Sequence, residues 1–112
     1  MKKIEAVVRT SRLDEIVERL RLIGTIGMTV TEAHGMSRST TSSTVVQGQR
    51  LWKTTAPRYE LMIVVPDQDV PHVVAAIVRC ARTDAPGDGL ITVSDIDGVM
   101  RIRTGEVDAD AI

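Results

Sequence analysis

The chain has 112 residues, with 14 Lys plus Arg against 15 Asp plus Glu and a formal net charge of -1. It therefore carries no overall basic field that would attract nucleic acid. It contains no apolar run near the roughly 20 residues needed to cross a bilayer, and it lacks an apolar signal segment at its start. The single cysteine excludes an intramolecular disulfide. We expect one cytoplasmic domain, without direct membrane insertion, and an aliphatic core, because Phe is absent.

The first third of the chain predicts a strand, a helix and a second strand. Residues 3–9 alternate between apolar and polar side chains, which is typical of a strand. Ser11 and Asp14 have the spacing of a capping box, and Gly24 suits the position just after a helix. Between them, apolar residues recur at helical spacing: Leu13, Ile16, Val17, Leu20 and Ile23. Residues 28–35 are rich in β-branched side chains and predict the second strand.

Residues 37–57 interrupt this pattern with a polar, low-complexity stretch that shows no hydrophobic period. Loops of this length inside a compact domain are usually functional or disordered. The segment from 37 to 58 carries four basic residues and no acidic one, together with the apolar residues Val45, Val46, Leu51 and Trp52. We interpret 37–57 as a mobile loop that docks onto a partner protein.

The second half predicts another strand–helix–strand unit. Residues 59–66 predict a third strand, and 61–65 are so continuously apolar that we expect both faces of this strand to be covered. Asp69 can cap a second helix, whose apolar stripe is Val70, Val73, Val74, Ile77 and Ala81. A loop over 83–89 and a fourth strand over 90–96 complete the pattern.

The sequence Gly-Asp-Gly over 87–89 is a candidate phosphate-binding loop. Glycine accepts positive φ and close approach, so the backbone N–H groups of such a loop can face an anion. Arg101 and Arg103 follow the fourth strand, and in an extended segment they would project side by side. Two adjacent guanidinium groups suit a phosphate. Within the C-terminal segment 98–112, the last residues, 106–112, are expected to fray.

The order of elements predicts an α+β fold, a ferredoxin-like βαββαβ sandwich with a long flexible loop between strands 2 and 3. The sheet face away from the helices needs a cover, so self-association is expected.

Enzymes, metal sites and RNA-binding surfaces have weak support in the sequence. His72 and Cys80 lie eight residues apart on one predicted helix, about 12 Å of rise, which is too far for a catalytic pair. His34 adds little to a metal set, so no metal site and no catalytic residue is predicted. An RNA-binding sheet needs stacking aromatics, and the strands offer only Tyr59. An acid–base enzyme using residues from two subunits stays a weaker alternative.

Four stretches resemble the PII signalling proteins, a family of trimeric nucleotide sensors: 1–6, 27–32, 63–67 and 87–105. The resemblance implies a single PII-like domain over 1–112, a homotrimer and a non-enzymatic regulator. It further implies that ADP or AMP, with ATP as a further candidate, binds between subunits. The implied site comprises Gly27, Met28, Thr29, Gly35, Ser37, Arg38, Val64, Gly87, Asp88, Gly89, Arg101 and Arg103. Arg38 is the candidate that couples occupancy to loop 37–57.

The chain departs from the PII pattern at several positions. Leu90 stands where a phosphate-binding lysine is typical, and the loss of a charged hydrogen bond costs roughly 1.5–3 kcal/mol, or about ten- to a hundredfold in affinity. We therefore expect ADP or AMP to bind at least as well as ATP. Ser39 replaces a glutamine that helps hold magnesium and 2-oxoglutarate, and Arg58 replaces a lysine, so we do not expect that response. Leu51 and Gln49 occupy the family's usual positions for covalent modification.

These departures suggest a divergent subgroup linked to bicarbonate or carboxysomes, or to nitrogen metabolism. Arg38, Ser39 and Arg58 are candidates for binding a second small anion such as bicarbonate. The target protein would be a transporter, an enzyme or a carboxysome component. The alternative hypothesis is a CutA-like trimer that binds a metal or a small anion.

Overall fold

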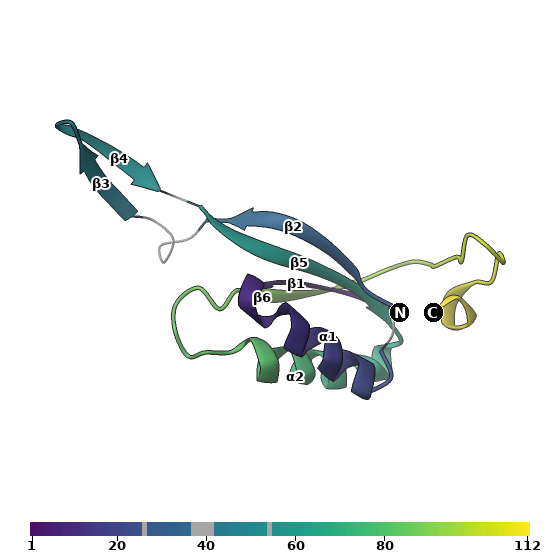
Figure 1. Cartoon of the computed structure of the whole chain (residues 1–112). Helices are drawn as coiled ribbons and strands as arrows, with labels where there is room; N and C mark the ends of the chain where they lie inside the picture. The colour runs from purple at the N-terminus through teal and green to yellow at the C-terminus, as the bar shows by residue number, and fades with distance from the viewer. Residues whose placement is uncertain (26, 37–41, 54) are drawn as a thin grey trace.

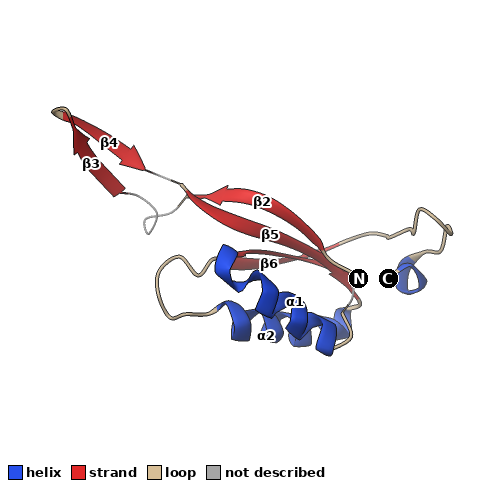
Figure 2. Cartoon of the chain, in the orientation of Figure 1, coloured by secondary structure: helices blue, strands red, loops and turns tan. Residues whose placement is uncertain are grey.

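The computed structural model describes residues 1–25, 27–36, 42–53 and 55–112, with only the backbone at 42, 44 and 51–53. Two helices and a four-stranded antiparallel sheet form the body, and a separate two-stranded hairpin projects from it (Figures 1 and 2). This is the ferredoxin-like α+β arrangement predicted from the sequence. Its main elements are β1 Lys2–Arg9, α1 Leu13–Leu22, β2 Thr29–Gly35, β3 Ser42–Val46, β4 Gln49–Lys53, β5 Ala56–Val65, α2 Val70–Ala81 and β6 Leu90–Asp95.

The sheet has the order β2-β5-β1-β6, so β1 and β5 are central and β2 and β6 form its two edges. Every neighbouring pair is antiparallel, with Ile4 opposite both Ile63 and Val93. Both helices pack on one face of the sheet, which leaves the other face open in the single chain (Figure 2).

The core lies between this sheet and the two helices. Alternate residues of β1 and β5 point into it: Ile4, Ala6 and Val8 from β1, and Leu61, Ile63 and Val65 from β5. They meet an apolar stripe from each helix, Ile16 and Leu20 from α1 and Val73 and Ile77 from α2. Full burial of such a side chain contributes about 1.5–3 kcal/mol. On the other face of β5, Met62 and Val64 are only half-buried. The helices cover one face of 61–65, and the cover of the other face, expected from self-association, stays a prediction.

The predicted helix caps are only partly confirmed. Gly24 ends α1 with φ +90, and its amide donates to the Arg21 carbonyl at 3.1 Å, as expected of a C′ glycine. Ser11 does not cap α1, because a 3-10 turn over Thr10–Arg12 leads directly into it. Asp69 stands at the N-cap of α2, but its side chain makes no cap hydrogen bond. Each helix is thus preceded directly by a 3-10 turn, Thr10–Arg12 before α1 and Asp67–Asp69 before α2.

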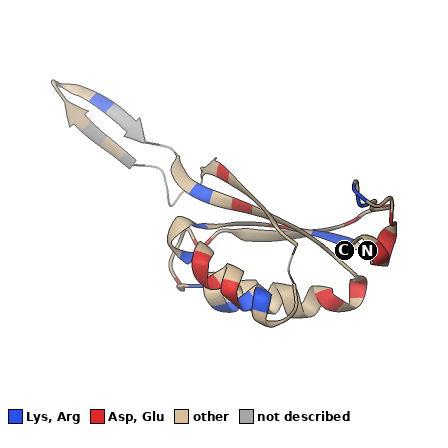
Figure 3. Cartoon of the chain, turned by 45° about the vertical axis from the view of Figure 1, so that its right-hand side comes forward, with Lys and Arg blue, Asp and Glu red and all other residues tan. Residues whose placement is uncertain are grey.

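The first turn of α1 carries the acidic residues Asp14 and Glu15 and its last turn the basic residues Arg19 and Arg21, and both signs are visible on the helical side of the molecule (Figure 3). Arg21 pairs with Glu18 at 2.6 Å and Arg12 with Glu15 at 3.5 Å. Exposed pairs of this kind contribute at most about 1 kcal/mol.

The segment 37–57 contains regular structure that the sequence analysis did not predict. Strands β3 and β4 pair from Ser42 opposite Lys53 to Val46 opposite Gln49. Gln47 and Gly48 join them with φ of 50 and 78, the conformation of a type I′ hairpin turn. The hairpin lengthens the molecule to 61 Å, against 27 and 21 Å along the other axes (Figure 1). Its docking role and its mobility stay predictions.

The C-terminal segment folds back on itself instead of extending. The Arg101 amide donates to the Glu106 carbonyl at 2.8 Å, and Met100 forms a bridge with Val107. A 3-10 helix over Asp108–Ala111 then buries Ala111. Apart from Ala111, residues 106–112 are exposed, and their fraying stays a prediction. Both termini lie at the end of the sheet away from the hairpin (Figure 1).

Candidate functional site

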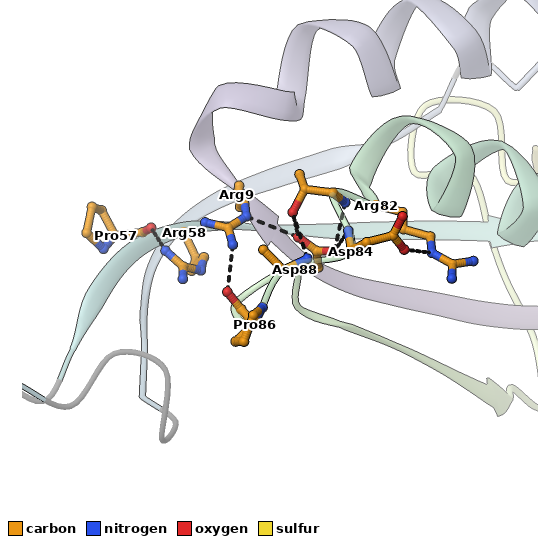
Figure 4. A network of polar contacts seen from close by, with 9 residues as sticks. Arg9, Pro57, Arg58, Arg82, Asp84, Pro86 and Asp88 are labelled. Carbon is orange, nitrogen blue, oxygen red and sulfur yellow. Dashed lines mark hydrogen bonds and ion pairs between the residues drawn. The ribbon is translucent and has the colours of Figure 1, made fainter.

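The loop before β6 is organised by the carboxylate of Asp88. This carboxylate accepts hydrogen bonds from the Thr83 amide at 2.7 Å, the Asp84 amide at 3.0 Å and the Thr83 hydroxyl. Arg9 Nε also donates to it, at 3.2 Å (Figure 4). These hydrogen bonds lower the pKa of Asp88 to about 2; the largest cause is the bond from the Thr83 hydroxyl and the second is the bond from the Thr83 amide. The Asp88 side chain therefore shapes the loop. The predicted phosphate binding would be carried out by the backbone N–H groups around it.

Glycine is required on both sides of Asp88. Gly87 has φ +99 and Gly89 has φ +95, a region that other residues rarely adopt. A Cβ on Gly89 would lie 1.7 Å from the Val7 carbonyl oxygen, so the loop passes directly over β1. The tight turn predicted from the Gly-Asp-Gly sequence is therefore present, and its role in phosphate binding stays a prediction.

A hollow of about 680 Å³ opens at the other end of the sheet, where the C-terminal segment faces β2 and β5. Five residues of the implied nucleotide site line it: Gly27, Met28, Thr29, Val64 and Arg101. Its volume falls within the range of small-molecule pockets, about 300–1,000 Å³. Arg101 Nε donates to the Ala111 carbonyl at 3.3 Å, which holds the C-terminal 3-10 helix beside the hollow.

The two arginines of the C-terminal segment are not side by side on a strand. Arg101 precedes a turn over 102–104, and Arg103 is exposed within that turn. The Gly105 amide closes the turn by donating to the Arg101 carbonyl at 2.8 Å. The predicted i, i+2 alignment of the two guanidinium groups is wrong, because the chain reverses at this point. Only Arg101 lines the hollow.

The glycine loop and the hollow are separate within one chain. Val64 in the hollow lies opposite Lys3, whereas Gly89 rests on the peptide group that joins Val7 to Val8. These positions are five residues apart along β1, about 17 Å, and β5 and β6 are two strand spacings apart, about 10 Å. The predicted base-side and phosphate-side residues thus form two clusters. Of the remaining predicted residues, Gly35 lies near the loop cluster, and Ser37, Arg38 and Ser39 fall outside the described residues.

Comparison with known proteins identifies the family. The family model described as "Nitrogen regulatory protein P-II" matches residues 1–106. The chain is 41% identical over 112 residues, the whole of both chains, to "Nitrogen regulatory protein P-II" of Pasteurella multocida (strain Pm70). It is 40% identical to the protein of the same name from Rhizobium meliloti (strain 1021) and 42% identical to "Nitrogen regulatory protein P-II 1" of Escherichia coli (strain K12), again over full length. The chain belongs to the P-II family.

Membership of the P-II family confirms the predicted class of function. P-II proteins are regulators of nitrogen metabolism and not enzymes, and they are characteristically homotrimers. The relatives named above are nitrogen regulatory proteins, so the bicarbonate, carboxysome and CutA hypotheses receive no support. Among the described residues, no three His, Cys, Asp or Glu side chains are placed to hold a metal ion. In the same part of the chain, no helix is long and apolar enough to cross a membrane.

The P-II sequence pattern gave no indication of one residue beside the glycine loop, Arg9. It ends β1, donates through Nε to Asp88, and donates through Nη2 to the Pro86 carbonyl at 2.7 Å (Figure 4). Arg58 lies directly opposite it on β5. The only sequence signal for Arg9 was its place at the end of a predicted strand, which does not reveal its neighbours across the sheet.

Proposed function

We propose that this P-II protein binds ADP or AMP, and ATP no more tightly, in the clefts between neighbouring subunits of its trimer. Nucleotide occupancy would be transmitted through the segment 37–57 to a target protein of nitrogen metabolism. The observation that supports this proposal is the separation of the implied site into two clusters within each chain. In a closed ring, the hollow of one subunit can meet the glycine loop of the next.

The hollow suits the apolar part of an adenine nucleotide. Met28 and Val64 offer apolar contacts, and Gly27 leaves open space beside them, because a Cβ there would meet nothing within 4 Å. Thr29 adds a hydroxyl at the start of β2 for the ribose. Arg101 and Arg103 would neutralise the phosphates together with the amides of residues 87–89 from the neighbouring subunit.

Transmission to the target would begin at the root of the hairpin. Gly35 ends β2 and lies against Arg58, since a Cβ on Gly35 would be 3.2 Å from the Arg58 side chain. Arg58 is near the start of β5, which continues from the hairpin. A phosphate bound beside these residues can shift the segment only as far as it binds one arrangement better than another. Arg38, in the intervening sequence, is the proposed coupling residue.

Mixed trimers test the inter-subunit site. The Asp88→Ala variant damages the loop and Arg101→Glu damages the hollow, so neither alone should bind ADP in calorimetry. In a ring built randomly from equal amounts of both, about one site in four joins an intact loop to an intact hollow. Recovery of that share of ADP sites after the two are unfolded and refolded together supports the proposal. No recovery, with trimers intact by light scattering, contradicts it.

A second effector is not part of this proposal. Ser39 and Arg58 replace the residues through which the family's magnesium and 2-oxoglutarate response would act. We therefore expect 2-oxoglutarate, titrated in the presence of ATP and magnesium, to show no micromolar binding. A micromolar response would contradict this reading of the two positions.

A further inference from the structure

The sheet face that the helices leave open carries a small charged cluster at the middle of its two central strands. The cluster consists of Lys3 and Glu5 of β1 and Glu60 of β5, which alternate with residues buried in the core. The Nζ atom of Lys3 lies 2.8 Å from Oε1 of Glu5. The carboxyl group of Glu60 forms a hydrogen bond with that of Glu5. Two carboxyl groups can form such a bond only when one of them carries a proton.

Strand register explains the contact between the two glutamates. Glu5 is opposite Met62, two residues from Glu60 on the same face of β5, so the glutamates are diagonal neighbours. Diagonal positions are about 7–8 Å apart, which is within reach of long side chains. On the edge strands, Thr31 of β2 is opposite Glu60 and Thr92 of β6 is opposite Glu5. The edge strands therefore place hydroxyl groups, and no charge, beside the glutamates.

One positive charge in the cluster faces two acidic groups. The hydrogen bond from Lys3, followed by its charge, lowers the pKa of Glu5. Glu5 is therefore the glutamate that stays ionised, and Glu60 is the one that can hold a proton between them.

The other cations on or beside this face do not complete the balance. Each makes its contact elsewhere: Arg9 with the Asp88 carboxylate, Arg58 with the Pro57 carbonyl and Arg101 with the Ala111 carbonyl. Arg58 is two residues before Glu60 on the same strand, but among the described residues it forms no ion pair. The cluster thus has an excess of acidic groups.

Assembly of the trimer is expected to remove this cluster from water. P-II proteins are characteristically homotrimers, and the open face carries the half-buried apolar residues Val7, Met62 and Val64 (Figure 2). These side chains lose contact with water if each subunit turns this face toward the other two. Three copies of the cluster then approach one another. Loss of hydration and the approach of like charges both disfavour the ionised form of a carboxyl group.

We propose that Glu60 takes up a proton when the trimer forms and donates it in a hydrogen bond to ionised Glu5. The trimer then binds more protons than the separate chains do. Association therefore strengthens as the pH falls and weakens as the pH rises. This makes the cluster a pH-sensitive device within the subunit interface, and it does not depend on the proposed adenylate site.

Substitutions by glutamine separate the proton from the hydrogen bond. Glu60→Gln places an amide that can donate to Glu5 at every pH without taking up a proton. Glu5→Gln leaves Lys3 free to pair with ionised Glu60, which also removes the need for a proton. Glu18→Gln, at an exposed ion pair of α1, is the matched control for the loss of one carboxylate.

The equilibrium between trimer and separate chains is measured by sedimentation at a fixed urea concentration at which both are populated. The pH is varied from about 5.5 to about 8.5, which stays above the range in which Asp88 titrates. Histidine side chains titrate within this interval. His34 and His72 are present in every variant, so their contribution cancels in the comparison.

Uptake of one proton per subunit should lower the trimer association constant of the wild type by up to about a thousandfold per pH unit as the pH rises. Glu60→Gln should lose most of this dependence and should form a tighter trimer than the wild type at the alkaline end. Glu18→Gln should match the wild type throughout.

A wild-type slope in Glu60→Gln would overturn the proposal, and so would a trimer weaker than the wild type at alkaline pH. Either result would mean that Glu60 is ionised within the assembled trimer. If Glu60→Gln does not fold, Glu5→Gln decides alone. A flattened slope in Glu5→Gln supports the shared proton, and a wild-type slope overturns it.

Discussion

The α-carbon of Gly89 lies so close to the carbonyl of Val7 that an added Cβ would be 1.7 Å from the Val7 oxygen. Because the obstacle is backbone, it cannot move aside without separating β6 from β1. We predict that Gly89→Ala lowers the free energy of unfolding by about 2–4 kcal/mol, measured by urea denaturation.

Gly24→Ala is the matched control for this contact. Gly24 has a similar φ of +90 but nothing within 4 Å of an added Cβ. Gly24→Ala should lower the free energy of unfolding by about 1 kcal/mol, through backbone strain alone. Equal losses at the two positions would mean that the Val7 contact contributes nothing.

The Asp88 carboxylate should make the protein sensitive to acid. Its pKa is lowered from 3.8 to about 2 in the folded state, chiefly by the Thr83 hydroxyl and amide. Its stabilising contribution is therefore present above pH 4 and is lost as the pH falls towards 2. In Asp88→Asn, the free energy of unfolding should be lower at pH 6 but should fall less steeply between pH 4 and 2.

Asp84→Asn controls for the loss of a carboxylate in the same loop. Asp84 pairs with Arg82 at 2.5 Å on the surface, and it makes none of the side-chain contacts of Asp88. This variant should keep the steep acid limb of the wild type. A wild-type slope in Asp88→Asn as well would show that the Thr83 contacts do not depend on charge.

Leu61 of the central strand β5 is fully buried between the sheet and the helices, so the stability of the fold depends on its packing. Leu61→Ala leaves a cavity and should cost about 2–5 kcal/mol. Leu22→Ala, at a residue 63% exposed on α1, should stay within about 0.5 kcal/mol of the wild type. Both unfolding curves are compared at one protomer concentration, because association adds to the apparent stability.

Leu90 is 62% exposed at the start of β6, directly after the glycine loop. If the apolar side chain of Leu90 is the reason that ATP binds no more tightly than ADP, Leu90→Lys should raise the affinity for ATP about ten- to a hundredfold. Leu22→Lys introduces the same charge at an equally exposed leucine far along the chain. Calorimetry showing a clear ATP preference in the unmodified protein would contradict the starting premise.

The strands and helices of the body could be predicted because their apolar residues repeat with the right period. Ile4, Ala6 and Val8 alternate into the core, and Ile16 and Leu20 share one helix face. The hairpin was missed because neither of its strands shows alternation: β3 consists of serine, threonine and two adjacent valines, and β4 has the sequence Gln-Arg-Leu-Trp-Lys. Its turn depends on the left-handed backbone of Gln47 and Gly48, and Gln is not a strong turn signal.

The candidate site was predictable where a backbone conformation requires a particular residue, and where the family resemblance pointed to Gly27, Met28, Thr29, Val64 and Arg101, which line the hollow. The Gly-Asp-Gly loop was recognisable because positive φ requires glycine. Two features had no local signal, since they arise from contacts between distant segments: the contact of Arg9 with Asp88, and the reversal of the chain after Arg101. Strand register, and not composition, brings Arg9 and Arg58 together.

The location of both chain ends has a practical consequence for any binding assay. Ala111 and Ile112 line the hollow, and the N-terminal amine contacts Asp67 nearby, whereas the hairpin tip is at the opposite extreme (Figure 1). An affinity tag or fluorescent fusion at either end would crowd the hollow and leave the hairpin unobstructed. A dye attached at the tip, in place of Gln47, would leave the hollow open and report directly on docking.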